Sequence, residues 1–161
     1  MGLGIAMSFI TAGISTKLLD VSPELVEQGL ARIKDHYRLN VERGRLECSE
    51  IKGRLGLISG ILNYDDLRDV DIVVEAVFED LNLKQEVFHC LNAACRSDAI
   101  LATNTSTLDI NKIAAVTARP DRVIGTHFFS PANMMKLLEV VRGRETSLGT
   151  VTSVLKLAKT I

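Results

Sequence analysis

A histidine and a glutamate twelve residues apart are the side chains of this sequence best suited to chemistry. His127 lies in the segment Thr126–Pro131 (THFFSP), where an apolar strand is predicted to end, and Glu139 lies on the next apolar stretch. A histidine held by a carboxylate can take a proton from a hydroxyl group near neutral pH. The pair therefore predicts acid–base chemistry. Alternatively, His127 is hydrogen-bonded to the backbone, and Glu139 forms a salt bridge with Arg142 or Lys136.

Length and composition place the chain among ordinary globular proteins. Its 161 residues suffice for one domain with a core, and 47% of them are apolar. The net charge of −1 creates no field that favours nucleic acid or an anionic membrane. The apolar runs are too short for a bilayer span, and residues 1–7 lack the basic region of a secretory signal. We therefore expect no nucleic-acid partner and no membrane partner.

The cysteines predict buried or partly buried free thiols rather than a metal site. Cys48, Cys90 and Cys95 are odd in number, and the spacing of the last two matches no common zinc motif. The three histidines are scattered along the chain. We expect a reducing compartment and no bound metal.

Helices and strands alternate in the predicted order of elements. Buried strands are expected at 16–20, 55–60, 71–77, 99–103, 122–127 and 136–141. Helices are expected at 2–12, 22–44, 47–54, 81–96, 109–116 and 148–161, with Ser22 as N-cap and Pro23 at the first helical position. This alternation indicates βαβ units and a parallel sheet.

The last two predicted strands form an exception to the parallel pattern. Only about eight residues separate them, whereas a parallel crossover needs a dozen or more. We therefore predict that 136–141 runs antiparallel to 122–127. Such a return can bring Glu139 back toward His127.

A weaker signal for a dinucleotide lies at the start of the chain. Gly2 and Gly4 open a helix of small residues, and Asp20 ends the next strand. In the dinucleotide fold, a glycine-rich turn admits the pyrophosphate, and an acid about 20 residues later binds the adenine ribose. An acid at that position favours NAD. Alternatively, the glycines are a flexible start and Asp20 is a turn residue.

Taken together, several segments resemble the NAD-binding domain of 3-hydroxyacyl-CoA dehydrogenases, most closely that of multifunctional and peroxisomal bifunctional β-oxidation enzymes. The segments that carry the resemblance are Met1–Ala6, Val74–Asp80 with Lys84, Thr103–Ser106, His127–Pro131 and Leu138–Val140. The resemblance implies a Rossmann-like, doubly wound α/β sheet that is mostly parallel with an antiparallel last strand. The family's first strand and C-terminal helical domain have no counterpart here. We therefore expect residues 1–161 to be an NAD-binding domain truncated at both ends.

The resemblance also implies catalytic roles. His127 would be the general base, Glu139 would hold its imidazole, and Ser106 would donate a hydrogen bond to the 3-oxygen of the substrate. A structural alternative for Ser106 is to cap the helix that begins near Asp109.

Cofactor contacts follow from the same resemblance, at Gly2, Asp20, Glu79, Lys84, Ser106 and Ser130. Glu79 and Lys84 could instead be a solvated pair at a helix start. Asn104 is expected to hold its loop, and Phe128 and Phe129 to form core or pocket wall.

The implied activity is the NAD-dependent oxidation of (S)-3-hydroxyacyl-CoA to 3-oxoacyl-CoA in β-oxidation. We expect an acyl-CoA substrate, a dimer or a larger multifunctional chain, and an intracellular location in the peroxisome or cytoplasm, with the mitochondrion left open. By itself, the chain is expected to be inactive. Two alternatives are a noncatalytic structural or nucleotide-binding protein with this fold, and another NAD-dependent 2- or 3-hydroxyacid dehydrogenase.

Overall fold

The computed structural model describes residues 1–161, which form two compact units. The smaller unit comprises Leu3–Asn63 with Ile161, and the larger unit comprises Met1–Gly2 with Tyr64–Thr160. No helix is both long and apolar enough to cross a bilayer.

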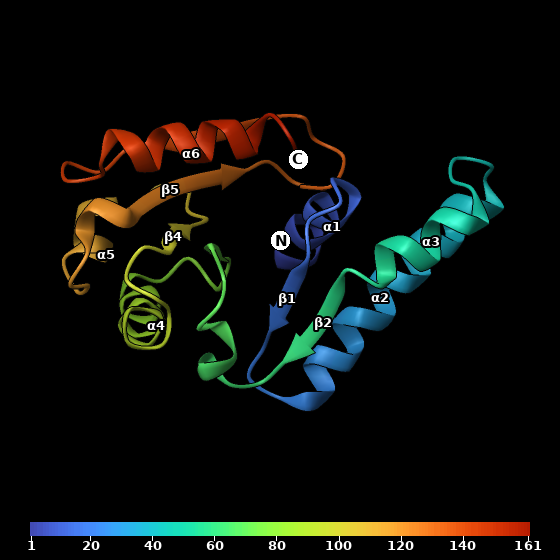
Figure 1. Ribbon diagram of the computed structural model, residues 1–161, viewed down its shortest axis with the longest axis horizontal. Coiled ribbons are helices and arrows are strands. Elements are labelled where there is room, and N and C mark those ends of the chain that lie inside the picture. The colour runs from blue at the N-terminus through green and yellow to red at the C-terminus, as the bar shows by residue number, and fades with distance from the viewer. The chain divides into compact units, whose positions relative to one another are not determined.

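The smaller unit contains a two-stranded parallel sheet flanked by helices (Figure 1). Strand β1 (Thr16–Leu19) pairs with β2 (Ile58–Ile61), with Thr16 opposite Ile58. The helices are α1 (Gly2–Thr11), α2 (Pro23–Glu42) and α3 (Cys48–Leu55). Apolar side chains of α1 and α2 form the core of this unit: Ala6, Ile10, Ile33 and Tyr37.

Local sequence signals explain where α2 begins. The Ser22 hydroxyl accepts a hydrogen bond from the backbone N–H of Leu25, and Pro23 occupies the first helical position. The hydroxyl satisfies a backbone donor that the helix itself leaves unpaired, and proline has no N–H to lose there. The predicted helix start is therefore confirmed.

The larger unit is built on a four-stranded sheet with the order β3-β4-β5-β6. The strands are β3 (Ile72–Glu75), β4 (Ile100–Thr103), β5 (Val123–Phe128) and β6 (Leu138–Val141). The first three run parallel to one another. The helices are α4 (Leu81–Ala94), α5 (Ile110–Ala114) and α6 (Leu148–Ala158), with short 3-10 turns η1 (Tyr64–Leu67) and η2 (Pro120–Arg122).

Helices cover both faces of this sheet. Ile124 packs with Val154 of α6, whereas Gly125, the next residue of β5, faces Ile110 of α5. Successive residues of a strand point to opposite faces, so α5 and α6 lie on opposite sides. The predicted mostly parallel, doubly wound sheet is confirmed for this unit.

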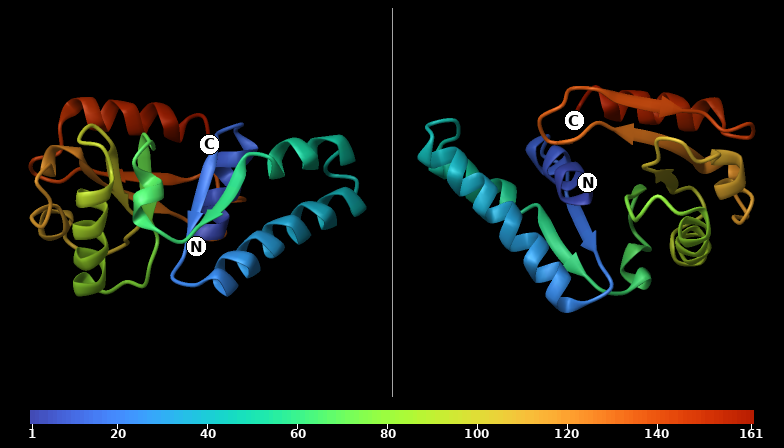
Figure 2. Two further views of the ribbon diagram at one scale, coloured as in Figure 1. Left: turned by 60° about the horizontal axis from the view of Figure 1, so that its bottom comes forward. Right: turned by 180° about the vertical axis from the view of Figure 1, so that it is seen from behind.

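The last strand pair is antiparallel, as predicted, and β5 and β6 point in opposite directions in Figure 2. The register places His127 directly opposite Glu139. Gly125 permits the close approach, because a Cβ atom there would lie 2.9 Å from the Cβ of Val141 and 2.8 Å from the Cδ1 of Ile110. Any larger residue would push β6, and with it Glu139, away from β5.

The strands do not form one continuous hydrogen-bonded sheet. β1 pairs only with β2, and β3 pairs only with β4, so β1 and β3 each have one edge without a strand partner. The predicted boundaries of helices and strands differ from the observed ones by a few residues, and the 3-10 turns were not predicted. The lack of a first strand stays a prediction.

Candidate active site

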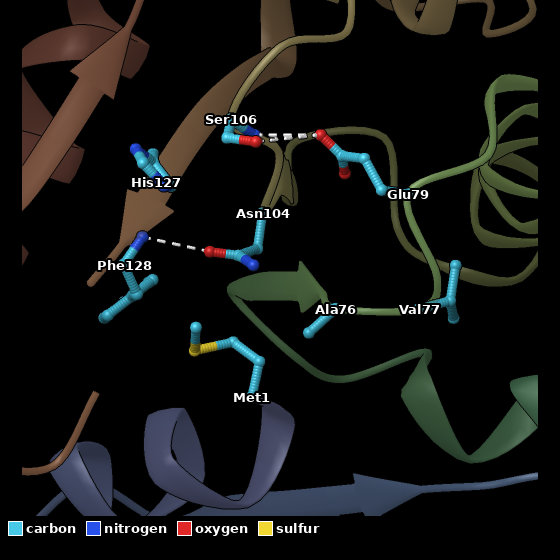
Figure 3. Close-up of a pocket in the computed structure, with 8 residues that line it drawn as sticks. All are labelled: Met1, Ala76, Val77, Glu79, Asn104, Ser106, His127 and Phe128. Carbon is cyan, nitrogen blue, oxygen red and sulfur yellow. Dashed lines mark hydrogen bonds between the residues drawn. The ribbon is translucent and has the colours of Figure 1, made fainter. Parts of the chain in front are cut away.

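The ends of three parallel strands place the predicted catalytic segments together. β3, β4 and β5 end at one edge of the larger sheet, where open α/β sheets bind their ligands. A pocket of about 230 Å³ lies at this edge (Figure 3). It is lined by Met1, Ala76, Val77, Glu79, Asn104, Ser106, His127 and Phe128. His127 and Ser106 therefore share one pocket.

His127 and Glu139 form the predicted pair. Imidazole Nδ1 lies 2.8 Å from Oε2 of Glu139, so the alternative of a backbone-bonded histidine is wrong. A carboxylate can only accept a hydrogen bond, so Nδ1 carries the proton and Nε2 is left for a ligand. The ring of Phe129 packs on the imidazole with 4.6 Å between centroids. The Glu139 side chain is 54% exposed, so the pair orients His127 more than it stabilises the fold.

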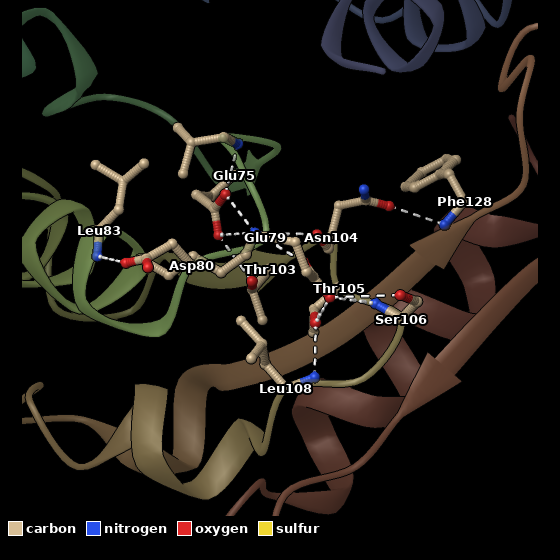
Figure 4. Close-up of polar contacts among 12 residues, drawn as sticks. Glu75, Glu79, Asp80, Leu83, Thr103, Asn104, Thr105, Ser106, Leu108 and Phe128 are labelled. Carbon is tan, nitrogen blue, oxygen red and sulfur yellow. Dashed lines mark hydrogen bonds and ion pairs between the residues drawn. The ribbon is translucent and has the colours of Figure 1, made fainter.

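A second carboxylate holds the loop that carries Ser106 (Figure 4). Oε1 of Glu79 accepts hydrogen bonds from the Thr105 hydroxyl, from the backbone N–H of Ser106 at 3.0 Å and from that of Thr107 at 3.3 Å. The Ser106 hydroxyl is itself 3.4 Å from Oε1. The sequence did not reveal this contact. Glu79 thus fixes the position of Ser106 at the pocket.

Ser106 does not cap the following helix. The side chain of Asp109 accepts a hydrogen bond from the backbone N–H of Asn111 at 2.9 Å and is the N-cap of α5. The hydroxyl of Thr105 accepts one from Leu108. The capping alternative for Ser106 is therefore wrong, and its side chain lies at the pocket.

Two opposing effects determine the pKa of Glu79. Desolvation of its carboxylate raises the pKa, but the hydrogen bonds from Thr105, Ser106 and Thr107 and the positive charge of Lys84 lower it further than desolvation raises it. The pKa of Glu79 in the folded protein therefore lies below its ordinary value. Glu79 remains ionised in the folded protein and keeps accepting these bonds at neutral pH.

We predict that Glu79 contributes stability that is lost in acid. Because its pKa is lower in the folded than in the unfolded state, the contribution is full above the unfolded value, about 4.3, and declines as the pH falls through the folded value. Glu79→Gln keeps an acceptor but cannot titrate. The difference in unfolding free energy between wild type and Glu79→Gln should be constant near neutral pH and shrink below about pH 4.3.

Denaturant unfolding over a pH series measures this difference. Glu86→Gln, an exposed position of α4, is the matched control and should differ from wild type by a small amount at every pH. A difference for Glu79→Gln that stays the same through the acid range would contradict the role of its charge.

Lys84 is buried and paired, not solvated. Its side chain is 0% exposed, and Nζ lies 2.8 Å from Oε1 and 3.1 Å from Oε2 of Glu75. Nζ also donates to the backbone carbonyl of Asn104 at 3.1 Å and lies 3.8 Å from Glu79. The hydroxyl of Thr103 donates to Glu75 at 2.7 Å. The solvated-pair alternative is wrong for Lys84.

Glu75 and Thr103 were not predicted as members of this network. A usable signal was present in the sequence, since Glu75 is an acid inside the β-branched strand 71–77 and Lys84 follows nine residues later. Buried charges are normally paired, so an acid in a buried strand requires a basic partner.

The remaining cofactor candidates are Gly2, Asp20 and Ser130. Gly2 belongs to the larger unit, and a Cβ atom at its position would lie 3.9 Å from the Cβ of Ala76. Asp20 directly follows β1 in the smaller unit and is exposed, with Oδ1 accepting a hydrogen bond from the backbone N–H of Val21. Ser130 is exposed two residues after β5 and does not line the pocket.

The sequence is similar to those of known dehydrogenases. Residues 1–161 match the family described as 3-hydroxyacyl-CoA dehydrogenase, NAD binding domain. The chain is 45% identical over 162 residues to the peroxisomal bifunctional enzyme of Cavia porcellus, covering 100% of this chain and 22% of the relative. It is 41% identical over 161 residues to a 3-hydroxybutyryl-CoA dehydrogenase of Clostridioides difficile, covering 100% of this chain and 57% of the relative.

A similar fold is found in a solved structure. The (S)-3-hydroxybutyryl-CoA dehydrogenase of Ralstonia eutropha superposes with a TM-score of 0.96 at 36% identity, over 99% of this chain and 56% of that one. The chain thus spans only part of the length of the relatives it matches. Because the family match extends over the whole sequence, the chain belongs to the family of 3-hydroxyacyl-CoA dehydrogenase NAD-binding domains, whose cofactor is NAD.

Proposed function

We propose that this chain is the catalytic NAD-binding part of a dehydrogenase that oxidises (S)-3-hydroxyacyl-CoA to 3-oxoacyl-CoA. The observation that carries the proposal is the His127–Glu139 pair at 2.8 Å, in a pocket that Ser106 also lines. A structural protein needs no such arrangement. The noncatalytic alternative does not account for the presence of Ser106, His127 and Glu139 together at one edge of the sheet.

In the proposed reaction, His127 removes a proton. Its Nε2 accepts the proton of the 3-hydroxyl group, and the O–H electrons form the new carbon–oxygen double bond. The chemistry that bound NAD supplies is acceptance of the hydride from carbon 3. Glu139 stabilises the imidazolium that forms, and His127 returns the proton in the reverse direction.

Ser106 is the proposed hydrogen-bond donor to the 3-oxygen. Glu79 holds the backbone of the Ser106 loop through several donors, so the hydroxyl is presented at the pocket without a large entropic cost. Ser106 and His127 would then contact the same oxygen, one as donor and one as proton acceptor.

The pocket fits one end of NAD rather than the whole cofactor. Its volume of about 230 Å³ lies below the ~300–1,000 Å³ of typical small-molecule pockets. We propose that the nicotinamide end enters it beside Ser106 and His127. The other proposed cofactor contacts are Gly2 for the pyrophosphate, Asp20 for the adenine ribose, and Glu79, Lys84 and Ser130.

We also propose that residues 1–161 act within a longer chain. The relatives continue beyond the matched segment, and the acyl-CoA substrate would contact that further part. A peroxisomal location is proposed because peroxisomal and glyoxysomal proteins are among the relatives at 40–45% identity, and a cytoplasmic one because bacterial relatives are similarly close. A dimeric or multifunctional assembly is part of the same proposal.

Assay of the full-length protein tests the proposal. With (S)-3-hydroxybutyryl-CoA and NAD we expect NADH absorbance to rise, and with the (R) enantiomer we expect no rise. Free 3-hydroxy and 2-hydroxy acids without CoA test the other dehydrogenase class. Turnover of the free acids but not of the thioester would contradict the substrate, and NAD binding by calorimetry without turnover of either would favour the noncatalytic alternative.

A further inference from the structure

Asn104 connects the two segments that carry the catalytic side chains. It directly follows β4, and its Oδ1 accepts a hydrogen bond from the backbone N–H of Phe128 at 2.9 Å (Figure 3). Phe128 is the last residue of β5 and follows His127 in the chain. Ser106 lies two residues after Asn104, so one side chain spans the gap between the Ser106 loop and the His127 strand end.

The contact occurs where the β4–β5 ladder has ended. The paired positions of these strands stop at Thr103 opposite Gly125. His127 and Phe128 lie beyond this point, where they still pair with β6 but no longer with β4. On the side of β4, the amide oxygen of Asn104 accepts the hydrogen bond from the backbone N–H of Phe128. The end of β5 is therefore held from both sides.

Asn104 itself is held firmly by its backbone. Its N–H donates to the carbonyl of Glu75 at 2.7 Å, and its carbonyl accepts from Nζ of the buried Lys84 at 3.1 Å. The backbone is thus bonded to β3 and α4 while the side chain is bonded to β5. Because a backbone N–H can only donate, the amide oxygen must face Phe128, and the orientation of the amide group is fixed.

We propose that Asn104 is a positioning residue, which sets the location of His127 relative to Ser106 by bonding the end of β5. The proposal deepens the proposed function, on which its kinetic consequence rests. Two groups that act on one oxygen must be placed to within a fraction of an ångström, and a misplacement of about 1 Å can cost about 100-fold in rate.

Hydrogen exchange tests the contact independently of any activity. In the full-length protein, the amide of Phe128 should exchange about tenfold faster in Asn104→Ala than in wild type, because its acceptor is gone. Asn104→Asp keeps an oxygen at the same place and should retain the protection. Unchanged protection of Phe128 in Asn104→Ala overturns the proposal, whether or not the protein is a dehydrogenase.

Kinetics test the consequence. We expect Asn104→Ala to lower kcat by about 10- to 100-fold, with KM for NAD within about twofold of wild type, and Asn104→Asp to recover most of kcat at the plateau of the pH profile. Equal losses in both variants would show that the amide nitrogen acts, which overturns the positioning role. Thermal unfolding checks folding, and Asn104→Leu, of similar branched shape, replaces the alanine variant if that one does not fold. If the wild-type protein shows no dehydrogenase activity, the proposed function is refuted. The hydrogen-exchange comparison still decides whether Asn104 holds the end of β5.

Discussion

Replacing His127 by alanine is expected to lower kcat for 3-hydroxybutyryl-CoA oxidation about 10³-fold in the full-length protein. Loss of a general base typically costs about 10²–10⁴-fold, and Nε2 of His127 is the ring nitrogen that Glu139 leaves free at the pocket. KM for NAD should change little, since the imidazole acts on the substrate hydroxyl. Steady-state NADH formation measures both constants.

The matched control for this variant is His89→Ala. His89 is an exposed residue of α4 and is not part of the pocket, so the change should leave kcat within about twofold. Thermal unfolding should show that both variants remain folded, because the side chain of His127 is partly exposed and packs on Phe129 without lying in the core. A kcat for His127→Ala within about threefold of wild type would remove His127 from the catalytic role.

Replacing Lys84 by methionine is expected to destabilise the larger unit by about 3–5 kcal/mol. The Nζ–Glu75 pair at 2.8 Å has side chains that are 0% and 1% exposed, so the variant leaves a carboxylate buried without its counter-charge. It also removes the donor to the carbonyl of Asn104. Denaturant unfolding measures the loss, and Lys156→Met on the exposed face of α6 serves as the control with a change of less than about 0.5 kcal/mol.

The double variant Glu75→Gln/Lys84→Met distinguishes a buried unpaired charge from a general packing defect. The amide oxygen of glutamine can still accept from the N–H of Val77, its amide nitrogen can donate to the hydroxyl oxygen of Thr103, and no charge remains buried. Most of the lost stability should therefore return. A double variant as unstable as Lys84→Met would show that the charge was not the cause.

The same double variant also tests the proposed cofactor contact of Lys84. If Lys84 contacts NAD, the double variant should regain stability but not NAD affinity in calorimetric titration. If Lys84 only holds Glu75 and Asn104 in place, stability and NAD affinity should recover together. The complete burial of its side chain makes this comparison informative.

Local patterns of the sequence were sufficient to predict most helices and strands. The β-branched run at 71–77 predicts β3, and Ser22 with Pro23 predicts the start of α2. These signals work because strand and helix formation at those places depends on neighbouring residues. The antiparallel return to β6 was also predictable, because the short connection leaves no room for a crossover.

The hydrogen-bond partners of the site were not predictable in the same way. Glu79 bonds the Ser106 loop across 27 residues of sequence, and Asn104 bonds Phe128 across 24. No periodicity or spacing indicates such contacts, because they depend on which strand ends become neighbours in the sheet. For the same reason, the buried ion pair of Lys84 with Glu75 was not predicted.

The sequence by itself determined the family, the order of elements and the residues proposed for acid–base chemistry, because these depend on residue types and their spacing along the chain. Only the tertiary structure decided how those residues are held: His127 opposite Glu139, Ser106 bonded through Glu79, and the end of β5 bonded through Asn104. The physical reason is that parallel strands adjacent in the sheet bring distant segments to one edge, where buried donors and acceptors must find partners in each other.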